Sequence, residues 1–209
     1  MPIWKSAIFC AAALSVAGLL VVTVPARAIE QPKFRLVHAY AGFEVRDYAS
    51  CLVAETTVKG TFEDAGDDGF KRLFDYISGN NSTRSSIAMT APVIQSGRKI
   101  AMTAPVLQSV SSGSFAISFV MPSSWTLQSL PVPNDRRVVI REMPSVRVAA
   151  IRYSGFWSED NYRTHLEALK AAMAREHLNA MGDPVWARYD PPFMPWFFRR
   201  NEILIPVSR

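Results

Sequence analysis

The chain repeats part of its own pattern at a spacing of 95 residues, and this repeat strongly constrains the fold. Residues 45–62 lie over residues 140–157 without a gap. The identical positions are Arg46/Arg141, Ser50/Ser145, Val53/Val148, Ala54/Ala149 and Gly60/Gly155. Apolar residues alternate in both segments, as in Val146, Val148 and Ala150, which is typical of a half-buried strand. Each segment therefore predicts a strand, a tight turn and a second strand.

A helix is expected after each copy, because apolar residues then recur at intervals of three and four. The first stripe is Phe70, Leu73, Phe74 and Ile77, and the second is Tyr162, Leu166, Leu169 and Met173. Gly79 is a natural stop for the first helix, and Ser158 is a natural N-cap for the second.

The remaining patterned segments favour strands, including Trp186–Tyr189 and Ile203–Val207 near the end of the chain. We therefore predict an α+β fold, in which a curved antiparallel β-sheet or barrel is flanked by two α-helices in a pseudo-twofold, duplicated strand–helix arrangement. Residues 29–209 are expected to form a single domain, with internal repeats at about 43–135 and 136–207.

The first 28 residues have the pattern of a signal peptide. Lys5 precedes an apolar run from Ala7 to Val24, and Ala26-Arg27-Ala28 fits the small-residue cleavage rule. We expect cleavage after Ala28 and a periplasmic or secreted protein without stable membrane insertion. The apolar run also approaches the length of a membrane span, so a retained anchor is the alternative.

The charge of the chain gives little support to nucleic-acid binding. The formal charge is +5, and removal of residues 1–28 takes away Lys5 and Arg27 and no acid, which leaves +3. No run of Lys and Arg accompanies this mild excess, so no nucleic-acid partner is expected. Cys51 is the one cysteine after residue 28, which rules out an internal disulfide there.

The sequence contains no motif of a known enzyme class. The nucleophile elbow, the phosphate-binding glycine loops and the zinc-protease motif are all absent. His38, His165 and His177 are spread along the chain without zinc-ligand spacing. We therefore assign no catalytic residue and no metal ligand.

A loop near the C-terminus is unusually rich in large apolar residues, namely Phe193, Met194, Trp196, Phe197 and Phe198. Because loops normally run over the surface, such side chains must either plug the core or line a ligand cleft. Arg199 and Arg200 follow, and they could clamp a carboxylate or pair with acids such as Glu202.

Two further marks identify a family. The heptamer IAMTAPV occurs at Ile87–Val93 and again at Ile100–Val106. The tail carries Tyr189-Asp190-Pro191-Pro192, then Pro195-Trp196, then Arg199 to Glu202 and a final apolar strand. From about Phe43 to Val207 the chain resembles the SOUL / haem-binding-protein family, whose members carry a version of the MTAPV core. The same α+β fold is implied by this resemblance.

The resemblance also implies a function, which is non-enzymatic binding of haem or a related tetrapyrrole in a shallow hydrophobic cleft for carriage or buffering. The cleft is expected between the first helix and the loop before the last strand. Carried over by position, and with the two arginines added, its residues are Phe70, Lys71, Leu73, Phe74, Ile77, Phe193, Met194, Trp196, Phe197, Arg199 and Arg200. The haem would be held non-covalently, and its axial ligand is unassigned. Asp47 and Tyr48 stand where some members are proposed to use a histidine.

Two alternatives stay open at the level of sequence. The duplicated strand–helix plan also resembles gyrase-inhibitor-like domains, whose pocket takes other amphipathic small molecules. An enzyme acting on such a ligand would need a buried acid or tyrosine in the cleft, such as Tyr76 or Glu202.

Overall fold

The computed structural model describes residues 29–83, 97–111 and 113–208. Its two long helices are α1 (Phe62–Ser78) and α2 (Glu159–Arg175), and a short 3₁₀ helix, η1, covers Trp196–Phe198. The strands are β1 (Phe34–Tyr40), β2 (Phe43–Tyr48), β3 (Cys51–Val58), β4 (Asn81–Ser82), β5 (Val106–Ser111), β6 (Ser114–Val120), β7 (Val132–Pro133), β8 (Val138–Met143), β9 (Val146–Tyr153), β10 (Val185–Arg188) and β11 (Asn201–Pro206).

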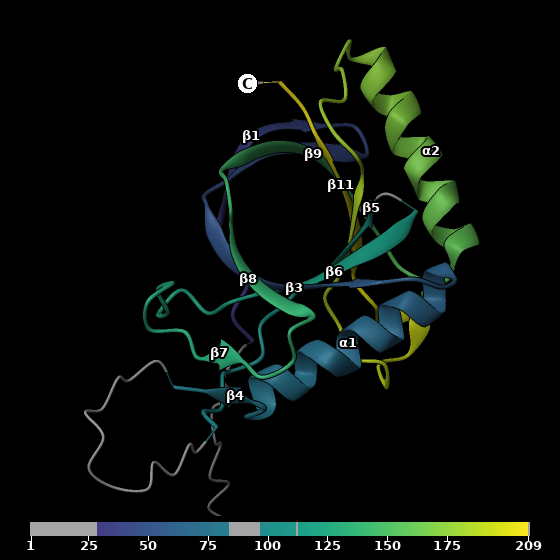
Figure 1. Cartoon of the computed structure of the whole chain (residues 1–209). Helices are drawn as coiled ribbons and strands as arrows, with labels where there is room; N and C mark the ends of the chain where they lie inside the picture. Colours follow the sequence, from purple (N-terminus) through teal and green to yellow (C-terminus); the bar gives the residue numbers. More distant parts are fainter. Residues whose placement is uncertain (1–28, 84–96, 112, 209) are drawn as a thin grey trace, which may run out of the picture.

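Nine of these strands form one antiparallel sheet in the order β1-β2-β9-β11-β10-β5-β6-β3-β8. Figure 1 looks along the hollow of this sheet, which curls into a ring with α1 and α2 on its outer face. The predicted α+β fold, with a curved antiparallel sheet and two flanking helices, is confirmed.

The repeated segments pair with each other, and this pairing corrects one prediction. We expected a tight turn between the two strands of each copy, but β2 pairs with β9 and β3 with β8. Tyr48 pairs with Val146, and Cys51 pairs with Met143 after two intervening residues on each chain. Because these links are equally long, the register does not change across them. β2 and β3 therefore form one long strand with a bend, and β8 and β9 form a second one that runs antiparallel to it.

The pairing also has a local two-fold symmetry. Val45 pairs with Ala149, and the residues 95 positions away from them, Ile140 and Ala54, pair with each other. The bend at Ala49-Ser50 lies opposite the bend at Pro144-Ser145, so this symmetry is centred on the two links.

Helix α1 covers the half of the sheet that contains β3 and β6. The hydroxyl of Thr61 accepts a hydrogen bond from the backbone N–H of Asp64 and caps the helix, and Gly79 ends it as predicted. Leu73 and Ile77 of the predicted stripe are buried against the sheet. Gly69 allows a close approach, because a Cβ there would lie 2.3 Å from Cγ1 of Ile117 on β6.

Helix α2 covers the opposite half of the sheet, over β9 and β11. Ser158 caps it as predicted, with its hydroxyl accepting from the N–H of Asn161. Leu169 and Met173 are buried, with Ile203 and Ile205 of β11 in the same apolar cluster. The two helices therefore cover two separate apolar clusters on the outside of one curled sheet.

Several sequence-based predictions fall outside the described residues. These are the signal segment 1–28 and the first heptamer, Ile87–Val93. The second heptamer is described and leads into β5, with its Thr103 hydroxyl donating to the carbonyl oxygen of Val120. Within the described ranges, no helix combines the length and the apolar character that a membrane span requires.

Candidate functional site

A cleft with a volume of about 200 Å³ lies between α1 and the chain that follows β10. The residues that line it are Ile29, Asp67, Phe70, Phe74, Met102, Thr103, Ala104, Val106, Trp157, Arg188, Tyr189, Asp190, Pro191 and Pro192. Phe70 and Phe74 stack on one another in the wall that α1 provides, with ring centroids 5.8 Å apart. We call this cavity the α1 cleft. It lies where the family resemblance places a cleft, between the first helix and the loop before the last strand.

Arg188 is a buried cation of this cleft, and Asp67 and Asp190 line the same space without an ion-pair contact to it. It ends β10 on the outer face of the sheet and is buried, with its guanidinium carbon 4.9 Å from the ring centre of Trp186. Among the described residues its Nε and Nη2 atoms find no hydrogen-bond acceptor. Burial lowers the pKa of Arg188 to about 10, so the guanidinium still carries its charge at neutral pH.

Two residues of α1, Gly66 and Asp67, shape the surroundings of the Arg188 side chain. Gly66 lies against it, because a Cβ on Gly66 would be 3.0 Å from Nη2 of Arg188. The next residue, Asp67, lines the same cleft and acts on Arg188 through its charge without an ion-pair contact. The helix therefore leaves room for the guanidinium and supplies no carboxylate that neutralises it directly.

The predicted helix residues divide between two faces of α1. Phe70 and Phe74 line the cleft, and the side chain of Phe74 is 47% exposed. Leu73 and Ile77 point to the sheet and belong to the core. Lys71 lies on the exposed side and forms a long ion pair with Asp68, with 3.7 Å between Nζ and Oδ1.

The predicted aromatic loop does not plug the core. Phe193 is 84% exposed, and Trp196, Phe197 and Phe198 are exposed as well. Trp196 stacks on Phe156 with ring centroids 5.1 Å apart, so the loop is fixed to the turn before α2. Met194 is half-buried. At the α1 cleft, the loop contributes Pro191 and Pro192.

The two arginines that follow the loop have different surroundings. Arg199 donates from Nε to the carbonyl oxygen of Met194 over 2.8 Å and from Nη2 to that of Pro192 over 2.6 Å. Its guanidinium also lies 4.4 Å from the ring centre of Trp157. Arg199 therefore holds the loop in shape.

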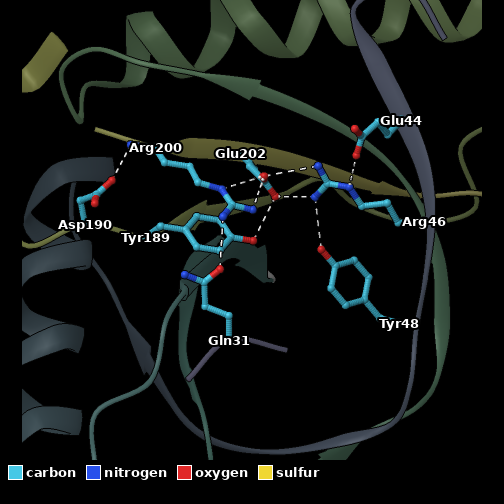
Figure 2. A network of polar contacts seen from close by, with 8 residues as sticks. All are labelled: Gln31, Glu44, Arg46, Tyr48, Tyr189, Asp190, Arg200 and Glu202. Atoms are coloured by element: carbon cyan, nitrogen blue, oxygen red, sulfur yellow. Dashed lines mark hydrogen bonds and ion pairs between the residues drawn. The ribbon is translucent and has the colours of Figure 1, made fainter. Parts of the chain in front are cut away.

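Arg200 belongs to a polar network on the inner face of the sheet (Figure 2). It donates to Oε1 of Glu202 over 2.8 Å, and Arg46 donates to Oε2 of the same carboxylate over 2.7 Å. The hydroxyl of Tyr189 adds a third hydrogen bond over 3.0 Å. Burial would lower the pKa of Arg46, but the hydrogen bond and the charge of Glu202 outweigh burial and raise it. Arg200 thus pairs with an acid of the sheet, one of the two arrangements that the sequence left open.

The two residues considered for an enzymatic role, Glu202 and Tyr76, are buried, and both form hydrogen bonds outside the α1 cleft. Glu202 is fully buried and held by Arg46 and Arg200, and it does not line the α1 cleft. The hydroxyl of Tyr76 donates to the carbonyl oxygen of Pro131 over 2.9 Å. In the described part of the chain, no three His, Cys, Asp or Glu side chains gather where they could hold a metal ion.

Sequence reasoning missed Arg188, although it placed the surrounding strand. The signal that could have revealed it is alternation, because Trp186 and Arg188 must share a face of β10. An arginine beside a tryptophan on a covered face is unusual enough to mark a site. Met102 packs against the core cluster below α1 and also lines the cleft.

Comparison with known proteins gives a consistent result. The family model described as "SOUL heme-binding protein" matches residues 29–206. "Heme-binding protein 1" of Xenopus laevis is 27% identical over 162 residues, which is 77% of this chain and 81% of that protein. "Heme-binding protein 2" of Homo sapiens is 26% identical over 170 residues, covering 77% of this chain and 79% of that protein.

Solved structures of lower sequence identity share the fold. The C-terminal domain of EcmrR has a TM-score of 0.52 at 10% identity, covering 80% of this chain and 97% of that chain. A structure described as a hydrolase from Listeria innocua has a TM-score of 0.52 at 13% identity, covering 82% and 94%. At these identities the likeness concerns the fold alone.

Proposed function

Because the chain belongs to the SOUL heme-binding protein family, we propose that it binds haem or a related tetrapyrrole in the α1 cleft. The proposal concerns non-covalent binding without catalysis. Support comes from the family match, from the curated relatives named for haem binding, and from the composition of the cleft wall.

Arg188 is the observation that carries the proposal. A buried guanidinium with unpaired donors is costly, on the order of 1–3 kcal/mol for each unsatisfied group. A carboxylate guest would accept those hydrogen bonds in a charge-assisted pair. A porphyrin brings two carboxylates at one edge of an apolar plate, so it would satisfy Arg188 while its rings contact Phe70 and Phe74.

The size of the cleft favours partial burial of such a guest. A space of about 200 Å³ is below the 300–1,000 Å³ typical of enclosing ligand pockets. The macrocycle would therefore lie with one edge in the cleft and the rest along exposed apolar side chains such as Phe74. Met102 and Tyr189 are lining residues of types that can ligate haem iron, which leaves the axial ligand unassigned.

Partial burial suits a protein that carries or buffers haem. Burying about 400 Å² of apolar surface would contribute roughly 10 kcal/mol before the costs of association, which are on the order of 4–15 kcal/mol. The resulting affinity would be modest and reversible. The signal-like segment of residues 1–28 leads us to place this function outside the cytoplasm.

Titration with hemin, followed by the Soret band, tests the proposal. We expect saturable binding by the unaltered chain and about tenfold weaker binding by Arg188→Met, because one charge-assisted pair is lost. Phe74→Ala should weaken binding by a smaller factor. Iron-free protoporphyrin should bind similarly if the macrocycle and its carboxylates make the main contacts.

Arg175→Met is the matched control, because Arg175 is exposed at the end of α2, outside the lining residues of the cleft. Its hemin affinity should equal that of the unaltered chain. Equal affinities for all four proteins, or no saturable change in the micromolar range, would refute the proposed site.

A further inference from the structure

The inner side of the curled sheet contains a second cavity of about 200 Å³. Its walls come from several strands, for example Leu107 of β5, Val120 of β6, Val146 of β9 and Leu204 of β11. Leu107, Val146 and Leu204 remain partly exposed although they lie on the inner face. The inner side chains therefore do not fill the hollow of the sheet, and the cavity wall is almost wholly apolar.

This inner cavity lies beside a wider groove of about 850 Å³ at the bend of the long strands. Pro32, Ala49, Cys51 and Val120 line both spaces, so the two are adjacent and share part of their walls. The groove has a mixed wall in which Trp125 and Leu127 stand beside polar groups. An apolar chamber next to a partly polar groove matches a molecule with an apolar tail and a polar head.

The charged residues that line the groove restrict the head group that a guest can carry. Glu30, Glu142 and Lys33 are the charged residues that line the groove, which leaves one net negative charge. Near the inner end, Tyr48 and Tyr189 separate the chamber from the charged network of Figure 2. That network also has one net negative charge, because its two arginines, Arg46 and Arg200, stand beside three acids, namely Glu44, Asp190 and Glu202.

We propose that this inner compartment is a second binding site, which takes a small amphiphile with a compact apolar tail and an uncharged or cationic head. A dry cavity of about 150 Å³ is large enough for benzene, so a single ring fits the chamber. The site is distinct from the α1 cleft, whose unpaired charge is the cation Arg188. Arg188 gives the α1 cleft a buried hydrogen-bond donor for a carboxylate, whereas the wall of the chamber is almost wholly apolar, so binding at this second site does not depend on haem binding.

Three probes with the same ring test the proposal by isothermal titration calorimetry on the full chain. These probes are phenethylamine, phenethyl alcohol and phenylacetate. The amine and the alcohol should bind, and phenylacetate should bind more weakly than the amine by a factor on the order of ten at low salt. Added salt should reduce this difference, because the groove is open to solvent. Glu142→Lys should reverse the preference between amine and carboxylate.

The position of the site is tested by a blocking variant and a matched control. Val146→Phe places a larger side chain in the chamber and should abolish binding of the amine, whereas Val139→Phe makes the same change at an exposed position of β8 and should not. Both variants should keep the hemin affinity of the unaltered chain, which also shows that they fold. Prior saturation with hemin should leave amine binding unchanged.

Three results would overturn the inference. The first is absence of binding by the amine and the alcohol, and the second is equal amine binding by the two phenylalanine variants. The third is displacement of the amine by hemin, which would place both guests in one site. The first two results do not bear on whether hemin binds in the α1 cleft, because hemin binding is measured separately, whereas the third would also question the position of the hemin site.

Discussion

At the scale of single residues, two buried charges of this protein have opposite surroundings. Glu202 accepts hydrogen bonds from Arg46, Arg200 and Tyr189 and is fully buried. Arg188 is nearly as buried, but its Nε and Nη2 have no acceptor among the described residues. A charge with several partners is compatible with a stable interior, whereas an unpaired one is costly to bury and is the observation on which the proposed haem site depends.

Substitution of Glu202 should therefore destabilise the fold strongly. Glu202→Gln leaves Arg46 and Arg200 without their shared counter-charge, and loss of one partner of a buried ion pair typically costs about 3–5 kcal/mol. Urea unfolding followed by circular dichroism measures this loss. Glu167→Gln, at an exposed position of α2, should change the free energy of unfolding by less than about 0.5 kcal/mol. Similar effects of the two changes would show that the network contributes little.

At the scale of elements, the apolar stripe of α1 decides which face of the helix is buried, and two glycines decide how closely the helix approaches the sheet. Leu73 and Ile77 bury the helix, but the depth at which it lies on the sheet depends on Gly66 and Gly69. Gly69 lets the helix approach Ile117, and Gly66 leaves space for Arg188. The same close approach that packs the core therefore also shapes the cleft.

Gly69→Ala tests this close approach. Alanine favours a helix by about 1 kcal/mol over glycine, but its Cβ would lie 2.3 Å from Cγ1 of Ile117. Overpacking costs typically 1–3 kcal/mol, so we expect a net loss of stability and a weaker affinity for hemin as α1 is displaced. Thermal unfolding and the hemin titration measure the two effects. If the Gly69→Ala protein were more stable, the gain in helix propensity would outweigh the loss in packing. Asp75→Ala, at an exposed position of the same helix, serves as the control.

At the scale of the whole molecule, the two long bent strands organise the sheet. Segments 43–58 and 138–153 run antiparallel in one register, with a two-residue bend at the middle of each. Their outer faces carry the two helices, and the inner compartment lies beside the bends. The inner compartment therefore depends on the pairing between these two segments.

Insertion of one residue tests the shared register. One glycine placed between Ala49 and Ser50 should shift β2 against β3, because a one-residue slip moves every side chain to the other face of a strand. The loss of stability should exceed the roughly 1 kcal/mol of an average point substitution. A second glycine between Pro144 and Ser145 should restore the equal lengths and recover much of the loss, as measured by urea unfolding. Additive losses from the two insertions would argue against one continuous register.

Local patterns predicted the elements well. The helical stripes, the Ser158 cap and the Gly79 stop follow from periodicity and from the hydrogen bonds of helix ends, which depend on neighbours in sequence. The pairing of β2 with β9 was not predicted, because alternation shows which face of a strand is apolar and not which strand lies beside it. For the same reason the sequence suggested a turn where the structure has a bend.

Periodicity, end signals and the family motifs were properties of the chain alone, and they determined the fold class and the two helices. Only the tertiary structure decided which cations are free, because pairing depends on residues that lie far apart in the sequence. Arg200 meets Arg46 across Glu202, and Arg188 meets no acid within hydrogen-bonding distance. Folding thus placed the unpaired charge on β10, and not on the arginines that follow the aromatic loop.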